Sequence, residues 1–85
     1  MQATVASDRS SADVAWEIGV GFQGRRFASE AASAVVEWLI ERGVPRVQAF
    51  IHPEHAASAV VASRAGLSAS DEWADGEVVW RRTDL

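Results

Sequence analysis

The chain has 85 residues, a formal net charge of −4 at pH 7 and no cysteine. These values allow one compact domain and exclude both a disulfide framework and a cysteine-based zinc site. The acidic balance also argues against a protein that binds nucleic acid through its overall charge. No apolar run approaches the roughly 20 residues that cross a bilayer, and the N-terminal residues lack the pattern of a secretory signal. We therefore expect a cytoplasmic protein, which the absence of cysteine fits.

The first part of the chain predicts a lead-in followed by a strand. Residues 1–13 are rich in Ser, Ala and Asp, and we expect them to form a flexible lead-in before a single domain over residues 14–85. The segment 14–22, VAWEIGVGF, alternates apolar side chains with small or polar ones, which predicts a strand. Its two glycines leave the second face bare and permit close approach of a ligand or another backbone.

A helix is predicted over residues 29–42, where apolar side chains recur at steps of three and four. Ser29 and Glu30 mark its start. Gly43 is a good residue to follow a helix, and Pro45 prevents its continuation.

Three more elements follow the first helix. Residues 46–52 alternate and predict a second strand, and residues 55–65 predict a shorter helix. A turn at Asp75-Gly76 precedes a strand over residues 77–82, and one further short strand is expected before that turn. The β-α-β-α-β order predicts an α/β domain (α+β by some schemes), in which two helices flank a mixed sheet.

The stretch GFQGRRFASEAA, residues 21–32, joins the predicted first strand to the predicted first helix. A strand, a glycine-containing loop and a helix N-terminus form a common phosphate-binding arrangement, because the first-turn N–H groups have no partner within the helix. Arg25 and Arg26 would add positive charge there. The alternative is a solvated connection with two surface arginines, since the spacing matches neither the Walker motif nor GxGxxG.

The stretch AWEIGVGFQGRRFASEAASAVVEWLIERG resembles the central segment of the GCN5-related N-acetyltransferases, most nearly the ribosomal-protein N-terminal acetyltransferase branch. The phosphate loop of that family reads Gln/Arg-x-x-Gly-x-Gly/Ala, and residues 23–28 occupy it here. HPEHAASAVVASRAGL resembles the Asn-x-x-Ser helix of the branch, with His55 at the Asn and Ser58 at the Ser. The resemblance covers residues 14–82 and implies a truncated acyl-CoA N-acyltransferase fold.

The resemblance implies that the protein binds acetyl-CoA, whose acetyl group an amine attacks directly. The implied catalytic residues are Glu17, a general base acting through water, and Ser58, a donor to the CoA sulfur. A solvent-facing Glu17 and a Ser58 that bonds back to a helix carbonyl are the alternatives. The loop N–H groups would bind the pyrophosphate, and the strand before it would pair with the pantetheine arm. The implied cofactor-binding residues are Ile18, Gly19, Val20, Gln23, Gly24, Arg25, Arg26, Phe27, Ala28, His55 and Ser58.

The histidine pair and the tryptophans each have a structural and a functional interpretation. His52 and His55 form an H-x-x-H pattern, but Pro53 separates them and no carboxylate cluster accompanies them, so we expect no metal site. The tryptophans are expected to pack in the core or at its edge, except that Trp73 lies in a polar stretch where it would line a substrate mouth.

The sequence departs from the family pattern in two ways. Arg26 replaces the central glycine of the loop, which places bulk and charge beside the phosphates. The family elements that precede Val14 are missing, and they build much of the acceptor site. We expect acetyl-CoA and an amine acceptor, either a small molecule or a protein N-terminus, as partners. A homodimer through the exposed edge strand is also expected. The alternatives are a truncated, non-catalytic CoA-binding remnant and an edge-strand interaction module.

Overall fold

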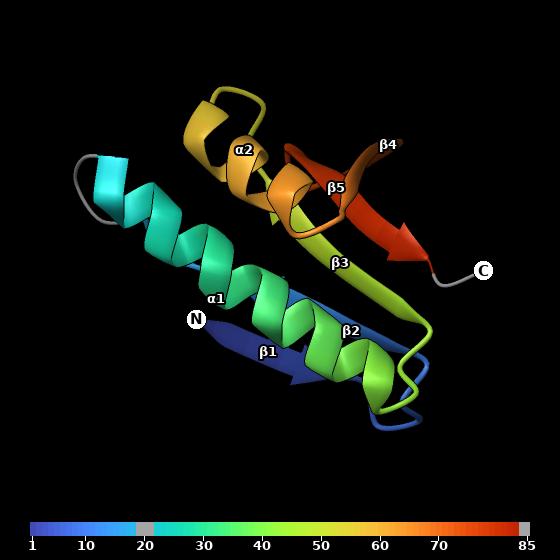
Figure 1. Cartoon of the computed structure of the whole chain (residues 1–85). Coiled ribbons are helices and arrows are strands. Elements are labelled where there is room, and N and C mark those ends of the chain that lie inside the picture. Colours follow the sequence, from blue (N-terminus) through green and yellow to red (C-terminus); the bar gives the residue numbers. More distant parts are fainter. Residues whose placement is uncertain (19–21, 84–85) are drawn as a thin grey trace.

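The computed structural model describes residues 1–18 and 22–83 as a five-stranded sheet with two helices (Figure 1). This is the mixed sheet with two helices that the sequence predicts. One strand precedes the expected β-α-β-α-β order, and the additional short strand is present before the last one. The elements in chain order are β1 (Gln2–Val5), β2 (Ser11–Ala15), α1 (Phe22–Glu41), β3 (Arg46–Ile51), α2 (Ala56–Arg64), β4 (Ser68–Ala74) and β5 (Glu77–Thr83).

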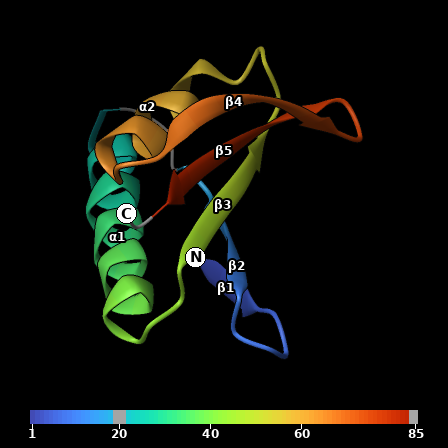
Figure 2. The same ribbon diagram turned by 90° about the vertical axis from the view of Figure 1, so that its right-hand side faces the viewer.

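The strands lie in the order β1-β2-β3-β5-β4. Only β2 and β3 run parallel, and α1 is the crossover that joins them, as a parallel pair requires. The other three pairings are antiparallel. Both helices lie on the same face of the twisted sheet, where they pack against each other (Figure 2). No helix in the described part of the chain is long and apolar enough to span a membrane.

The core lies between the helices and the face of the sheet that they cover. Side chains of β2 and β3 enter it at alternate positions, and those of α1 enter it at steps of three and four, as the two periods demand. The residues that contribute these side chains are Ala12, Val14, Ala28, Ala32, Val36, Leu39, Val47, Ala49 and Ile51. Each fully buried Val or Leu contributes about 1.5–3 kcal/mol, so this interface determines the orientation of α1 on the sheet.

The opposite face of the sheet carries a polar row that crosses four strands. The amide nitrogen of Gln48 on β3 donates to a carboxylate oxygen of Asp13 on β2 at 2.7 Å. Arg81 on β5 donates to the Gln48 side-chain oxygen at 3.5 Å and forms an ion pair with Glu72 on β4. Polar cross-strand contacts of this kind fit a sheet face that no helix covers.

The flexible lead-in expected over residues 1–13 is replaced by β1 and the first half of β2. The Ser- and Asp-rich composition belongs to the turn between them. A carboxylate oxygen of Asp8 accepts hydrogen bonds from the hydroxyl and the backbone N–H of Ser10, at 2.7 and 3.0 Å. These bonds hold the pKa of Asp8 below its ordinary value. Side chains that bond their own backbone two residues on favour turns, and this one joins β1 to β2.

The first strand and the first helix also differ from the predicted ranges. The strand predicted over residues 14–22 is Ser11–Ala15, and α1 begins at Phe22 rather than at residue 29. Ser29 does not begin the helix but is buried within it. The Gln, Arg and Phe residues before it are compatible with a helix, so the pattern extends toward the N-terminus. The later elements lie within one or two residues of their predicted bounds.

Candidate functional site

A cleft opens where the two parallel strands separate. Their ladder pairs only Ser11–Asp13 with Arg46–Gln48, although both strands continue beyond it. The ends of β2 and β3 therefore border a cleft of about 220 Å³. It is lined by Val14, Ala15 and Trp16 on one side, and by Ala49, Phe50, Ile51, His52, His55, Ser58 and Glu77 on the other sides.

The turn between β3 and α2 places three polar side chains at this cleft. The backbone N–H of His55 donates to the carbonyl of His52 at 2.9 Å, which closes the turn just before the helix. His55 is the N-cap of α2, and Ser58 follows in the first turn. The Oγ atom of Ser58 lies 2.9 Å from Nδ1 of His55, and Ser58 is 6% exposed. The sequence-predicted pair is thus brought together at the end of β3.

Trp16 lies directly after β2 and borders the cleft together with two adjoining hollows. Its side chain packs against the core, yet the indole N–H is buried and has no hydrogen-bond partner among the described residues. A buried donor without an acceptor costs about 1–3 kcal/mol, so such a group is strained or is completed by water or a ligand. The three open spaces beside Trp16 have room for either partner.

A hollow of about 320 Å³ lies at the N-terminal end of α1. Gly24, Phe27 and Ala28 line it from the helix, and Trp16 and Glu17 line it from the chain after β2. The first four N–H groups of a helix have no partner within it, and the helix dipole places partial positive charge there. The first turn of α1 contains no acidic side chain. This end of the helix therefore attracts an anionic group, although the Glu17 carboxylate that borders the hollow opposes one.

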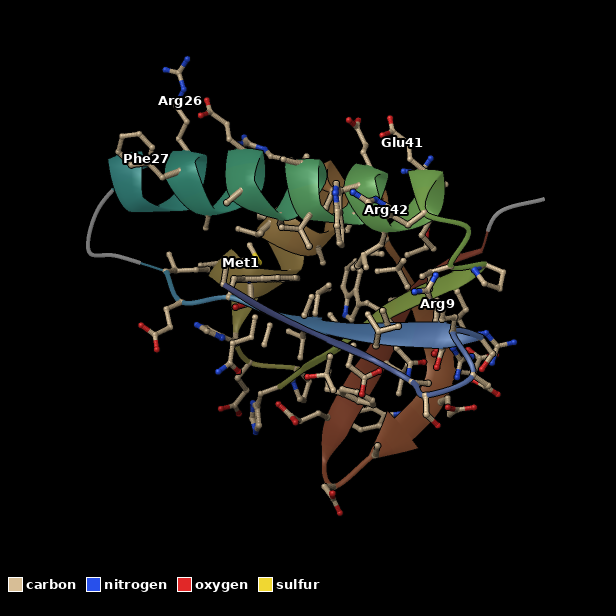
Figure 3. The ribbon with its side chains drawn as sticks, turned by 90° about the horizontal axis from the view of Figure 1, so that it is seen from below. Met1, Arg9, Arg26, Phe27, Glu41 and Arg42 are labelled. Carbon is tan, nitrogen blue, oxygen red and sulfur yellow. The ribbon has the colours of Figure 1, made fainter. Side chains whose placement is uncertain are left out.

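Arg26 lies in a different environment from the one its place in the loop suggests. It is exposed, pairs with Glu30 at 3.5 Å on the same helix, and points away from the sheet (Figure 3). Its backbone is helical, and within the described ranges only Arg9 and Asp75 among non-glycine residues have positive φ. Arg26 therefore carries no left-handed backbone strain at the position of the loop glycine.

A third hollow, of about 400 Å³, contains the carboxylate residue Glu17. Glu17 is exposed, and it lines this space with Met1 and Gln2 of the β1 end. The hollow shares Ala15 and Trp16 with the cleft, so the two spaces adjoin. Glu17 and Ser58 thus lie on different sides of Trp16.

A groove of about 520 Å³ separates the two helices on their outer side. It is lined by Arg26, Ser29, Glu30, Ser33, Ala34 and Glu37 of α1 and by Arg64 of α2, so two arginines and two carboxylates border it. The Ser29 hydroxyl is buried and has no hydrogen-bond partner in the described part of the chain. The groove begins at the same end of α1 as the hollow that contains Gly24 and Phe27.

The other site residues predicted from the sequence do not all line these open spaces. Ile18 packs against the core, and Gln23 and Arg25 lie in the first turn of α1. Gly19 and Val20 lie outside the described residues. Trp73 is exposed on β4 and does not line the cleft.

Of the ten residues that line the cleft, the sequence predicts only His55 and Ser58 as site residues, and the others include Trp16, His52 and Glu77. Glu77 reaches the cleft because β5 pairs with β3 in a register that joins Ile51 to Val78. That pairing has no local signal in the sequence. Within residues 1–18 and 22–83, no group of three or more metal-binding side chains is found.

Comparisons with known proteins agree with this architecture. A family model described as an acetyltransferase (GNAT) domain matches residues 2–68. The chain is similar to the structure of a "putative ribosomal-protein-serine acetyltransferase" from Vibrio cholerae, with a TM-score of 0.73 and 21% identity over 91% of this chain and 50% of that chain. The chain is also similar to the structure of an acetyltransferase from Agrobacterium tumefaciens str. C58, with a TM-score of 0.73 and 28% identity over 86% of this chain and 45% of that chain. The chain spans about half the length of these structures. No curated protein matches it.

Proposed function

Because the chain belongs to the GNAT acetyltransferase family, we propose that it binds acetyl-CoA and transfers the acetyl group to a primary amine. The observation that carries this proposal is a set of open spaces that all border Trp16. One lies at the N-terminus of α1, and another is the cleft between β2 and β3. An acyl-CoA has the matching chemistry, with an anionic pyrophosphate, an amide-containing arm and a thioester in that order.

Each part of acetyl-CoA has a proposed partner along these spaces. The first-turn N–H groups of α1 bind the pyrophosphate. The pantetheine arm lies where the β2–β3 ladder ends and pairs with the free strand edges, as an added strand does. The groove between the helices, with Arg26 and Arg64, accepts the nucleotide end. The thioester then lies in the cleft beside His55 and Ser58.

The proposed reaction is a direct attack of the amine on the thioester carbonyl. Holding the two reactants together supplies much of the rate enhancement. Glu17 removes the amine proton, through water, from the hollow on the β1 side of Trp16. Ser58 donates its hydroxyl proton to the departing sulfur from the other side. The proposed acceptor is a small amine or a protein N-terminus, and the net charge of −4 favours a cationic one.

Calorimetric titration of the chain with acetyl-CoA tests the binding proposal. We expect Gly24→Asp to weaken binding at least tenfold, because a carboxylate in the first turn of α1 opposes the pyrophosphate. Gly24→Ala adds a methyl group at the same position without adding charge, and it should retain most of the affinity. Ser68→Asp, on the far edge strand, controls for net charge. Equal affinities for all four proteins would place the pyrophosphate elsewhere.

Steady-state acetyl transfer to a panel of amines tests the roles of the two carboxylates. Glu17→Gln should lower kcat about a hundredfold, the usual contribution of a general base, while the affinity for acetyl-CoA is retained. Glu77→Gln tests the competing carboxylate, because Glu77 lines the cleft from β5 on the Ser58 side. A loss of activity in Glu77→Gln alone would assign the base to Glu77. If the wild-type chain binds CoA tightly but transfers no acetyl group to any amine, the protein is a non-catalytic CoA-binding domain.

A second proposal concerns self-association through β1. This strand is the edge of the sheet. Exposed apolar side chains from the β1 end and from α1 border shared hollows, Met1 with Phe27 and Val5 with Trp38. We call these side chains the apolar strip; they are Met1, Val5, Phe27 and Trp38. Unpaired edge strands recruit a strand from another chain. A homodimer paired through β1 would extend the sheet and cover the apolar strip.

A further inference from the structure

His55 and Ser58 form a hydrogen-bonded pair across the first turn of α2, with 2.9 Å between Nδ1 and Oγ. His55 occupies the N-cap position, but its side chain makes no capping bond to a backbone N–H. Both residues line the cleft. Ser58 is buried whereas His55 is exposed. The pair therefore connects the interior of the cleft with solvent.

Three titratable groups lie on the segments next to the pair. His52 and Glu77 line the same cleft from the end of β3 and the start of β5, and Glu54 lies in the turn before α2. Nδ1 of His52 is occupied by the backbone N–H of Glu54 at 3.2 Å. The positive end of the α2 dipole favours a thiolate in the cleft.

We propose that His55 is a positioning residue that supplies the proton for the departing CoA thiolate through Ser58. This inference rests on the proposed function, because it requires CoA sulfur in the cleft. The imidazolium Nδ1–H donates to Ser58 Oγ and orients the Ser58 hydroxyl toward the sulfur. A serine hydroxyl alone is a weak acid at neutral pH, whereas an imidazolium is matched to that range.

The proton and electron balance of this step is complete. The amine nitrogen forms a bond to the acetyl carbon, and the carbon–sulfur bond breaks with its electron pair on sulfur. The proton that the amine nitrogen loses passes through water to Glu17. Ser58 gives its hydroxyl proton to sulfur and receives the Nδ1 proton of His55. His55 becomes neutral and regains a proton from solvent, to which it is exposed. No other reactant is needed.

The pKa of the bound CoA thiol tests this relay without an amine acceptor. The chain has no cysteine, so the CoA thiol is the group that reacts fastest with iodoacetamide added to the protein–CoA complex. The alkylation rate against pH gives the thiol pKa, because the thiolate is the reactive form. We expect a pKa at least one unit lower than that of free CoA. His55→Asn keeps a hydrogen-bonding side chain but cannot hold the charge, and it should remove most of the shift.

Two further variants separate the relay from a structural role. Ser58→Ala should also remove most of the shift, whereas His52→Asn, beside the same cleft, should retain it. An unshifted thiol in the wild-type chain, or the same shift in His55→Asn, overturns the relay. Calorimetric titration with CoA keeps the two proposals distinct. Binding without a shift leaves the proposed function intact, and absence of binding overturns both.

Discussion

At the scale of single residues, Trp16 connects the core of the protein with its open spaces. The indole ring contributes packing, while its N–H remains without an acceptor in the described part of the chain. In most folded proteins a buried donor of this kind is paired. The indole N–H of Trp16 is thus a donor that a ligand carbonyl or phosphate oxygen could accept from.

Replacing Trp16 should thus have opposite effects on folding and on binding. Trp16→Phe keeps much of the packing and removes the unpaired donor, so we expect the free energy of unfolding to stay the same or to rise. Affinity for acetyl-CoA should fall about fivefold, which corresponds to about 1 kcal/mol for a neutral hydrogen bond. Urea unfolding and calorimetric titration measure the two quantities.

Trp80→Phe is the control for this experiment. Trp80 also packs against the core but does not line the cleft. It should lose stability and retain affinity. A Trp16→Phe protein with wild-type affinity would show that the N–H meets no ligand.

The site residues that sequence could predict are those that belong to local motifs. His55 and Ser58 share one helical turn, so their spacing along the chain already places them together. Trp16 and Glu77 are separated by about sixty residues and meet only through the pairing of β5 with β3 and the packing of the chain after β2. Tertiary pairings of this kind leave no periodic signal in a single sequence.

At the scale of elements, the β1–β2 hairpin shows how composition misleads. Its Ser- and Asp-rich residues indicate disorder when taken alone. Here Asp8 and Ser10 form the turn, and β2 enters the core through Ala12 and Val14. The start of α1 shows the converse, because Ser29 is a good N-terminal residue by type but lies inside the helix. In both cases burial in the whole fold overrides the local preference.

The turn should loosen in acid because of Asp8. Hydrogen bonds from Ser10, first its hydroxyl and then its N–H, hold the Asp8 pKa below its ordinary value. A carboxyl whose pKa is lower in the folded state stabilises the fold above its unfolded pKa. That contribution is lost as the pH falls through the folded value. We expect the amide resonance of Ser10 to titrate below about pH 4, with a midpoint under the ordinary aspartate value.

Asp8→Asn provides the comparison for this titration. Asparagine retains an oxygen that accepts the Ser10 hydrogen bonds but does not titrate. The Ser10 resonance should then become insensitive to pH over the same range. If it titrates as before, another group controls the turn.

At the scale of the whole molecule, the two edges of the sheet differ in character. β4 carries the acidic residues Asp71 and Glu72, which discourage pairing. β1 has no charged residue, and the apolar strip lies beside it. Arg42 covers part of this strip, with its guanidinium 4.7 Å from the centre of the Trp38 ring. Self-association is therefore expected at β1 rather than at β4.

Light scattering over a range of protein concentrations tests this expectation. The wild-type mass should rise with concentration, because a four-residue strand buries less area than a permanent interface requires. Val5→Lys should keep the mass of one chain, since a lysine on the edge blocks pairing. Ser68→Lys, on β4, should behave like the wild type. A wild-type mass that stays constant would exclude pairing through β1.

The early end of the β2–β3 ladder has a further consequence for backbone amides. Beyond Gln48, the backbone groups of β3 that face β2 have no strand to bond, although both strands continue. Amide hydrogens in that position exchange readily with deuterium, because no opening of a paired strand is required. The pantetheine arm of acetyl-CoA carries amide groups, so an arm bound between β2 and β3 would slow the exchange of these β3 amides. Deuterium uptake along residues 49–51 would then report whether the cleft is occupied, without a calorimetric titration or an assay of acetyl transfer.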